Sequence, residues 1–225
     1  MRCEAEQLEL DRVRHGGRRP GAGRKPVPNP RIRHRSRSAF ARRLPCHVTL
    51  KVRAGVPSLR TVRLVREIER SFAIGCERED FRLVHYSLQG NHAHLIVEAD
   101  NENVLGRGMK ALGARLARAV NRLFRRSGPA LADRYHVRVL RTPREVRNAL
   151  AYVLLNARRH AARAGRTLSR AFGIDPASSG RWFDGWQSAV ITPGPSPPVA
   201  PPRSWLLSVG WRRCGLLGPD EVPGG

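Results

Sequence analysis

At 225 residues, the chain can form one domain of ordinary size with tails, or two small domains. It carries 42 lysines and arginines against 18 aspartates and glutamates, so its formal net charge is +24. Self-repulsion of this size is relieved by a polyanion, and we therefore expect a nucleic-acid partner. The sequence has no run of 18 apolar residues and no basic-then-apolar leader, so we expect no membrane partner.

The cysteines are too widely separated in the sequence to indicate a zinc site or a redox pair. We therefore expect reduced thiols in a cytoplasmic, nucleoid-associated protein. The four cysteines are Cys3, Cys46, Cys76 and Cys214.

Residues 1–43 are expected to form a flexible basic arm. From Arg12 to Arg43 there are twelve lysines and arginines and no acidic residue, interrupted by glycines and prolines. Such a segment cannot bury enough apolar surface to fold alone. The Arg-Gly-Pro composition of residues 17–26 is similar to arms that lie in the DNA minor groove, and a solubilising tail fits it equally well. On either interpretation, phosphate contacts are expected from Arg18, Arg19, Arg24 and Lys25.

The middle of the chain predicts a strand, a helix, two strands, a helix and a strand in that order. The first helix is expected to be capped by Ser58 and closed by Gly75. This order is the split βαβ arrangement of ferredoxin-like α+β folds, with helices on one face of an antiparallel sheet and the other face free for a ligand or a further helix. The expected strands cover residues 46–52, 81–88, 92–99 and 135–140, and the second helix covers residues 103–126.

The helix over residues 103–126 carries arginines largely off its apolar stripe. A solvated helix face explains them, and a wall that faces DNA is the alternative. The two arginines that we assign to such a wall are Arg118 and Arg122.

His92 and His94 follow the turn signal Gly90-Asn91 at the start of the third predicted strand. Alternate residues of a strand share a face, so the two imidazoles lie side by side, where both can bind one divalent metal ion. A pair of half-buried structural histidines is the simpler interpretation of an isolated His-x-His.

A further helix is predicted after Thr142-Pro143-Arg144-Glu145, which is a capping box with proline at the first helical position. Tyr152 and Asn156 are four residues apart, so a continuous helix would place them on one face. A tyrosine on an amphipathic helix is usually a core or rim residue. Beside a His-x-His pair and a large positive charge, Tyr152 becomes a candidate nucleophile.

Gly90-Asn91-His92-Ala93-His94-Leu95-Ile96-Val97, followed by Ala151-Tyr152-Val153-Leu154-Leu155-Asn156, resembles the motifs of the REP-associated tyrosine transposases. These belong to the single-tyrosine HUH transposases, of the IS200-like kind, in which HUH stands for His-hydrophobic-His. The resemblance covers residues 45–160. It implies that His92, His94 and Asn156 bind Mg²⁺ or Mn²⁺, and that Tyr152 attacks single-stranded or hairpin DNA to form a 5′-phosphotyrosine intermediate. Both a monomer and a homodimer with exchanged tyrosine helices fit it.

Two alternatives from other classes stay open. One is a binding module for single-stranded or hairpin nucleic acid that uses no metal and forms no covalent adduct. The other is a metal-free ribonuclease of ferredoxin-like fold with a histidine as general base, whose product would be a 2′,3′-cyclic phosphate.

The catalytic domain is expected over residues 44–163, with a C-terminal extension over residues 164–225. Prolines between residues 193 and 202 indicate a stiff extended linker. Trp205 and Trp211 follow it in a short apolar segment. We expect this segment to dock on its own chain, with a partner or DNA bases as the alternative.

Overall fold

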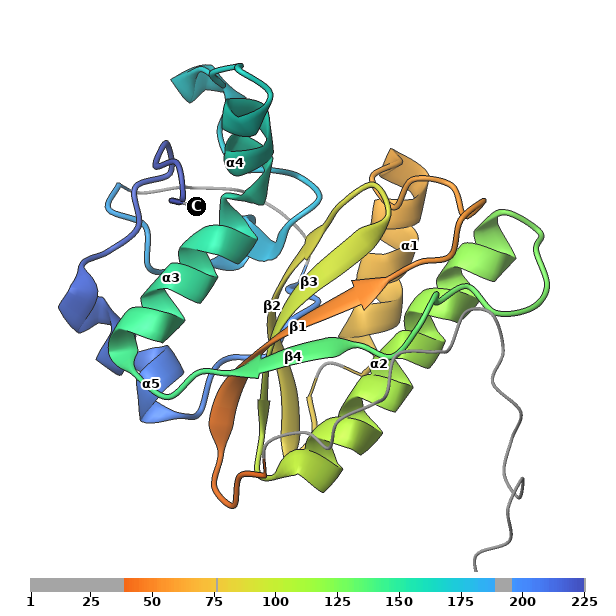
Figure 1. Ribbon diagram of the computed structural model, residues 1–225, viewed down its shortest axis with the longest axis horizontal. Coiled ribbons are helices and arrows are strands. Elements are labelled where there is room, and N and C mark those ends of the chain that lie inside the picture. The colour runs from red at the N-terminus through yellow and green to blue at the C-terminus, as the bar shows by residue number, and fades with distance from the viewer. Residues whose placement is uncertain (1–38, 76, 189–195, 225) are drawn as a thin grey trace, which may run out of the picture. The chain divides into compact units, whose positions relative to one another are not determined.

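The computed structural model describes residues 39–75, 77–188 and 196–224, which belong to one compact unit. Its centre is a four-stranded antiparallel sheet with the strand order β2-β3-β1-β4 (Figure 1). This order is that of a ferredoxin-like α+β fold, as the sequence predicted. The strands are β1 (Leu44–Lys51), β2 (Phe81–Leu88), β3 (His92–Ala99) and β4 (His136–Val139).

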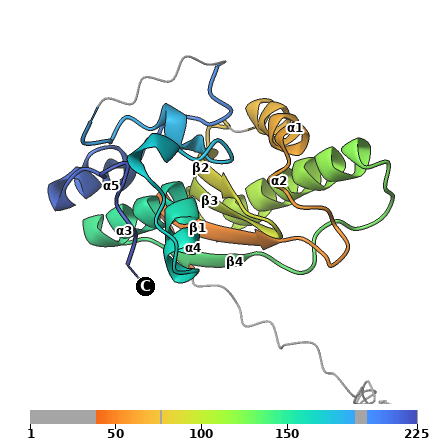
Figure 2. The same ribbon diagram turned by 90° about the horizontal axis from the view of Figure 1, so that it is seen from above.

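Helices cover both faces of the sheet. In Figure 2, α1 and α2 lie on one side of the strands and α3 lies on the other. Side chains alternate along a strand, so the sheet has a core on each face. The larger one lies beneath α1 and α2, and the smaller one, to which Val84 of β2 and Ile96 of β3 contribute, lies beneath α3. The helices are α1 (Val62–Ala73), α2 (Glu102–Leu123), α3 (Pro143–Leu154), α4 (Asn156–Arg163) and α5 (Trp205–Ser208), with short 3₁₀ helices η1 (Arg170–Phe172), η2 (Ser179–Trp182) and η3 (Gly210–Cys214).

The C-terminal extension packs on the domain, as expected from the sequence. Trp211 is 1% exposed and lies with Phe183 and Trp186 in the core beneath α3. The side chain of Glu98 in β3 is fully buried and accepts hydrogen bonds from the backbone of Arg203 and from the backbone and hydroxyl of Ser204, at 2.5–2.9 Å. These bonds satisfy a carboxylate that would otherwise be costly to bury.

The start of α1 differs from the prediction. The helix begins at Val62 after Thr61, and Ser58 is not its cap. Residues 53–60 form a loop that is tied to the β2–β3 turn, because the backbone of Leu59 donates to the carbonyl of Gly90 at 3.0 Å. This long-range contact outweighs the local capping preference of Ser58.

The helix that carries Tyr152 is also shorter than predicted. It ends at Leu154, and Asn156 begins a second helix after Leu155, whose φ of −107° and ψ of 20° depart from helical values. The Asn156 side chain donates to the carbonyl of Tyr152 at 3.3 Å. A side-chain bond to the carbonyl four residues back competes with the helical backbone bond and bends helices, which explains the break. The predicted capping box at Thr142 and Glu145 is confirmed.

None of the described helices is both long and apolar enough to cross a lipid bilayer. Among the described residues, Cys46 is a buried free thiol and Cys214 an exposed one. Phe40 and Arg43 lie at the start of the described part, where Phe40 is buried in the core and Arg43 forms an ion pair with Asp100 at 2.6 Å. The arm residues Arg18, Arg19, Arg24 and Lys25 lie outside the described residues.

Two glycines of α2 provide a matched test of the packing between this helix and β2. A Cβ at Gly108 would come within 2.3 Å of the Phe81 ring, whereas a Cβ at Gly106 would meet nothing within 4 Å. Gly108→Ala should therefore lower the free energy of unfolding by about 1–3 kcal/mol through overpacking. Gly106→Ala should raise it by about 0.5–1 kcal/mol, because alanine loses less backbone freedom on folding. Urea denaturation measures both, and equal effects would contradict the packing described.

Candidate active site

The register of β1 and β3 sets the position of the two predicted metal-ligand histidines. Thr49 lies directly opposite His94 in the antiparallel pair. Ala93 and Leu95 point into the core beneath α1 and α2. By alternation, His92, His94 and Thr49 point to the opposite face, the one that α3 covers. The two histidines of the motif therefore share a face, as predicted.

The imidazoles of His92 and His94 meet through their outer nitrogens, with the two Nε2 atoms 3.0 Å apart. The inner nitrogen of each ring has its own partner. Nδ1 of His92 lies 2.8 Å from Oδ1 of Asn91, and Nδ1 of His94 lies 3.1 Å from the Thr49 hydroxyl and 3.2 Å from Nε2 of His47. An amide oxygen only accepts, so in this amide orientation Nδ1 of a neutral His92 carries the proton and its Nε2 keeps a free lone pair.

Burial keeps these rings neutral. It lowers the pKa of His94 to about 3, with the neighbouring His47 and His92 adding to the shift. Burial likewise lowers the pKa of His47 to about 4, with Arg138 adding to it. The pKa of His92 is lowered by burial and then by the positive charge of His160 and Lys51. Neutral imidazole is the form that binds metal ions, so the ligand form does not depend on deprotonation near neutral pH.

Tyr152 projects from α3 onto this cluster. Its ring lies edge-on to His94, with the centroids 5.0 Å apart and the planes at 84°, and lies 5.5 Å from the ring of His47. The guanidinium carbon of Arg159, from α4, is 4.7 Å from the Tyr152 centroid. Arg159 thus places a positive charge over the face of the Tyr152 ring. The structure thus brings three of the four predicted site residues, His92, His94 and Tyr152, into one cluster.

Asn156 is the fourth predicted site residue, and it is fully buried at the junction of α3 and α4. Its Nδ2 donates to the Tyr152 carbonyl, while its Oδ1 is buried without a hydrogen-bond partner among the described residues. A buried carbonyl oxygen without a partner costs free energy, and a ligand that binds it removes that cost.

The donors present fit a hard divalent cation. They are the two neutral imidazoles of the His92–His94 pair and, at the junction of α3 and α4, the unpartnered amide oxygen of Asn156. Carbonyl oxygens suit Mg²⁺ and Mn²⁺. Within the described residues, no three His, Cys, Asp or Glu side chains are grouped so as to hold a metal ion.

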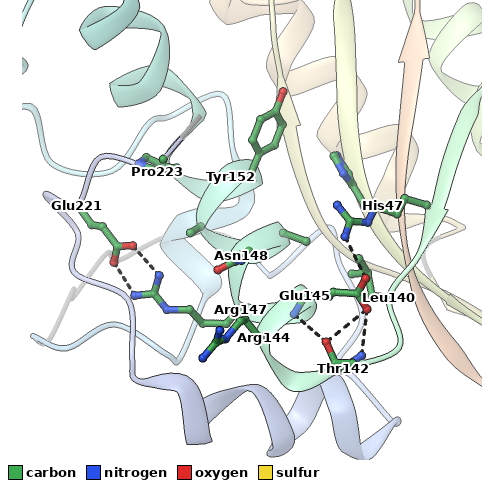
Figure 3. Close-up of a pocket in the computed structure, with 14 residues that line it drawn as sticks. His47, Leu140, Thr142, Arg144, Glu145, Arg147, Asn148, Tyr152, Glu221 and Pro223 are labelled. Carbon is green, nitrogen blue, oxygen red and sulfur yellow. Dashed lines mark hydrogen bonds and ion pairs between the residues drawn. The ribbon is translucent and has the colours of Figure 1, made fainter.

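A pocket of about 590 Å³ opens beside Tyr152, between β4, α3 and the C-terminal segment (Figure 3). His47 and Tyr152 lie at one end, and the capping box of α3 lies at the other. Arg147 reaches the C-terminal segment, where its guanidinium pairs with both oxygens of Glu221 at 2.6 and 2.8 Å.

The arginines predicted to form a DNA-facing wall lie elsewhere. Arg118 and Arg122 are exposed on α2, on the opposite face of the sheet from His94 and Tyr152. Arg122 forms an ion pair with Glu67 of α1. A strand bound at Tyr152 could reach them only by passing around the sheet.

Sequence reasoning missed four residues of the cluster. His47 and Thr49 alternate along β1. Their place beside His94 can be inferred only once β1 is known to pair with β3. Arg159 and His160 follow Asn156 on α4, and only the packing of that helix brings them to the site. The four residues are His47, Thr49, Arg159 and His160.

No protein-family model and no curated protein matches the sequence. Among solved structures, the chain is similar to the REP-associated tyrosine transposase bound to a REP hairpin. The likeness covers 66% of this chain and 82% of that one, with a TM-score of 0.50 and 14% sequence identity. The chain has the fold of a REP-associated tyrosine transposase. A proposed transposase of Deinococcus radiodurans R1 is also similar, over 48% of this chain and 87% of that one, at a TM-score of 0.38 and 16% identity.

The transposase fold agrees with the resemblance drawn from the sequence, and the two rest on different observations. The resemblance came from two short motifs around His92 and Tyr152, whereas the likeness of fold comes from the course of the backbone. The fold supplies the reason why motifs 60 residues apart can meet, since β3 and α3 pack against each other.

The neutral histidines make stability depend on pH. In the unfolded chain, His47 binds a proton below its ordinary pKa of about 6.5, whereas in the folded chain its pKa is about 4. Stability should therefore fall on acidification through this window, by about 2 kcal/mol between pH 8 and pH 5 for each such histidine. His47→Gln should remove about that much of the pH dependence. Urea denaturation at several pH values, in chelator, measures it, and an unchanged profile would contradict the assignment.

Proposed function

We propose that the protein is a metal-dependent transposase that cleaves and rejoins single-stranded DNA at hairpin sequences through a 5′-phosphotyrosine intermediate. The observation that carries the proposal is the contact of Tyr152 with the His92–His94 pair, at 5.0 Å between the Tyr152 and His94 ring centroids. The net charge of +24 and the hairpin bound to the transposase of similar fold support a DNA substrate.

The reaction that we propose is a transfer of the phosphoryl group to Tyr152. The phenol oxygen attacks the scissile phosphorus, an O–P bond to tyrosine forms, and the bond to the 3′-oxygen of the upstream strand breaks. The phenol gives up its proton, and the departing oxygen takes one up to become a free 3′-hydroxyl. Arg159 stabilises the negative charge that builds on the phenol oxygen. Attack by another 3′-hydroxyl on the phosphotyrosine reverses these steps. It joins two strands and releases the tyrosine without external energy.

A bound Mg²⁺ or Mn²⁺ would polarise the scissile phosphate and offset charge on the leaving oxygen. In this proposal His92, His94 and Asn156 hold it. Thr49 and His47 orient the ring of His94 through its inner nitrogen, and Asn91 does the same for His92. The basic arm, through residues such as Arg18 and Lys25, is proposed to contact DNA phosphates.

The nucleophile can be tested among the chain's three tyrosines. Tyr152→Phe should abolish the covalent adduct with hairpin DNA in Mn²⁺, because it removes the attacking oxygen, and should leave DNA affinity within about twofold. Tyr135→Phe is the matched control and should keep the adduct. Tyr86 is excluded by position, since its hydroxyl is committed to Glu69 at 2.7 Å in the other core. The readout is a denaturing gel, and an adduct that persists in the Tyr152→Phe variant would refute the assignment.

The cation can be tested by calorimetry as well as by cleavage. His92→Ala and His94→Ala should each lower Mn²⁺ affinity by more than about tenfold, because each removes a ligand. Thr49→Val should lower it by about tenfold, because it removes a hydroxyl that orients His94 without changing the side-chain shape.

Equal Mn²⁺ affinity in wild type and all three variants would mean that the histidine pair is structural. Cleavage that persists in chelator and leaves a 2′,3′-cyclic phosphate on RNA would instead support the ribonuclease alternative.

A further inference from the structure

The pocket beside Tyr152 has a polar row along α3 that the proposed chemistry does not use. Arg144, Asn148 and Tyr152 are spaced four residues apart, so they occupy one face of the helix, about one turn from each other. Figure 3 shows them following one another along α3. All three line the pocket, which reaches from the tyrosine to the N-terminal end of the helix.

The polar side chains that line the pocket differ in their availability. Arg147 is engaged by Glu221, and Arg138 donates to Glu145 at 2.9 Å. Arg144 and Asn148 are exposed and have no hydrogen bond or ion pair with the described residues. Within the row, the guanidinium of Arg144 and the amide of Asn148 are therefore available to a ligand.

The rest of the lining is mixed, and its two carboxylates, Glu145 and Glu221, are each paired with an arginine. Leu140, Ala149 and Ala151 add apolar surface to the pocket. A volume of about 590 Å³ lies in the ordinary range for ligand pockets, about 300–1,000 Å³, and can hold a nucleotide. An asparagine amide both donates and accepts, which allows it to pair with the edge of a base, and an arginine binds phosphate.

We propose that this pocket is a subsite for the single-stranded DNA next to the scissile phosphate. Asn148 reads the edge of the base adjoining the phosphate that Tyr152 attacks, and Arg144 holds the following phosphate. The inference rests on the proposed function, because it takes Tyr152 as the point of attack. It makes Asn148 a specificity-determining residue and Arg144 a positioning residue that carries no sequence information.

A binding selection tests the subsite without requiring cleavage. The full-length chain with Tyr152→Phe is mixed, in Mn²⁺, with a DNA hairpin whose single-stranded flanks are randomised, and the bound strands are sequenced. One base should be enriched by about tenfold at one flank position. Adding Asn148→Ala should remove the enrichment at that position and keep any other. Asn103→Ala, an exposed asparagine on α2, is the matched control and should change nothing.

Arg144→Gln has a different expected signature. It should weaken binding to all strands alike, lower the slope of log affinity against log salt by about 0.7, and leave the base preference intact. Asn148 lies on the helix surface and alanine is a good helix former, so the Asn148→Ala variant is expected to fold, which circular dichroism checks.

The proposal is overturned if the same bases are enriched with and without Asn148, or if no flank position shows a preference. Failure of the proposed function has a separate signature, since the chain that retains Tyr152 would form no adduct with any strand in the pool. A base preference that depends on Asn148, with no adduct formed, would support the subsite and contradict the proposed cleavage by Tyr152.

Discussion

The pairing of Thr49 with His94 across β1 and β3 is the contact on which the site depends. It puts a hydroxyl on the inner nitrogen of His94 at 3.1 Å, and it fixes the register that turns His92 and His94 toward α3. A slip of one residue would move both imidazoles into the core beneath α1 and α2 and bring alanine and leucine to the site. The local chemistry therefore rests on a backbone register that the apolar residues of β1 and β3 hold in place, because they fill the larger core.

The site also requires α3 to remain packed against this face of the sheet. The C-terminal extension holds it there. Trp211 and Phe183 fill the core beneath α3. Arg147 pairs with Glu221, and the guanidinium of Arg158 donates to the carbonyls of Pro219 and Leu168 at 2.8 Å each. Residues far along the chain from Tyr152 thus hold the helix that carries it. The long extension is part of the scaffold that positions the tyrosine, which accounts for its burial on the domain.

Local signals in the sequence predicted much of this arrangement. Gly90-Asn91 marks the turn before β3, and the bounds of β2 and β3 agree with the predicted ones. Thr142 and Glu145 mark the start of α3, and this signal is local because the two residues of a capping box are only three positions apart. Long-range contacts account for the errors. Ser58 would suit a helix cap, yet the bond from Leu59 to Gly90 draws its loop to another turn. The role of His47 depends on strand pairing, and that of Arg159 on the bend that Asn156 introduces, so neither has a local signal.

In the mechanism that we propose, the phenol oxygen of Tyr152 forms a covalent bond to DNA. The most direct measurement is mass spectrometry of the protein after reaction with hairpin DNA and Mn²⁺, followed by nuclease trimming and proteolysis. We expect a nucleotide phosphate on the peptide that contains Tyr152 and on no other. A phosphate on a peptide that contains Tyr135, or cleaved DNA with every tyrosine unmodified, would contradict it.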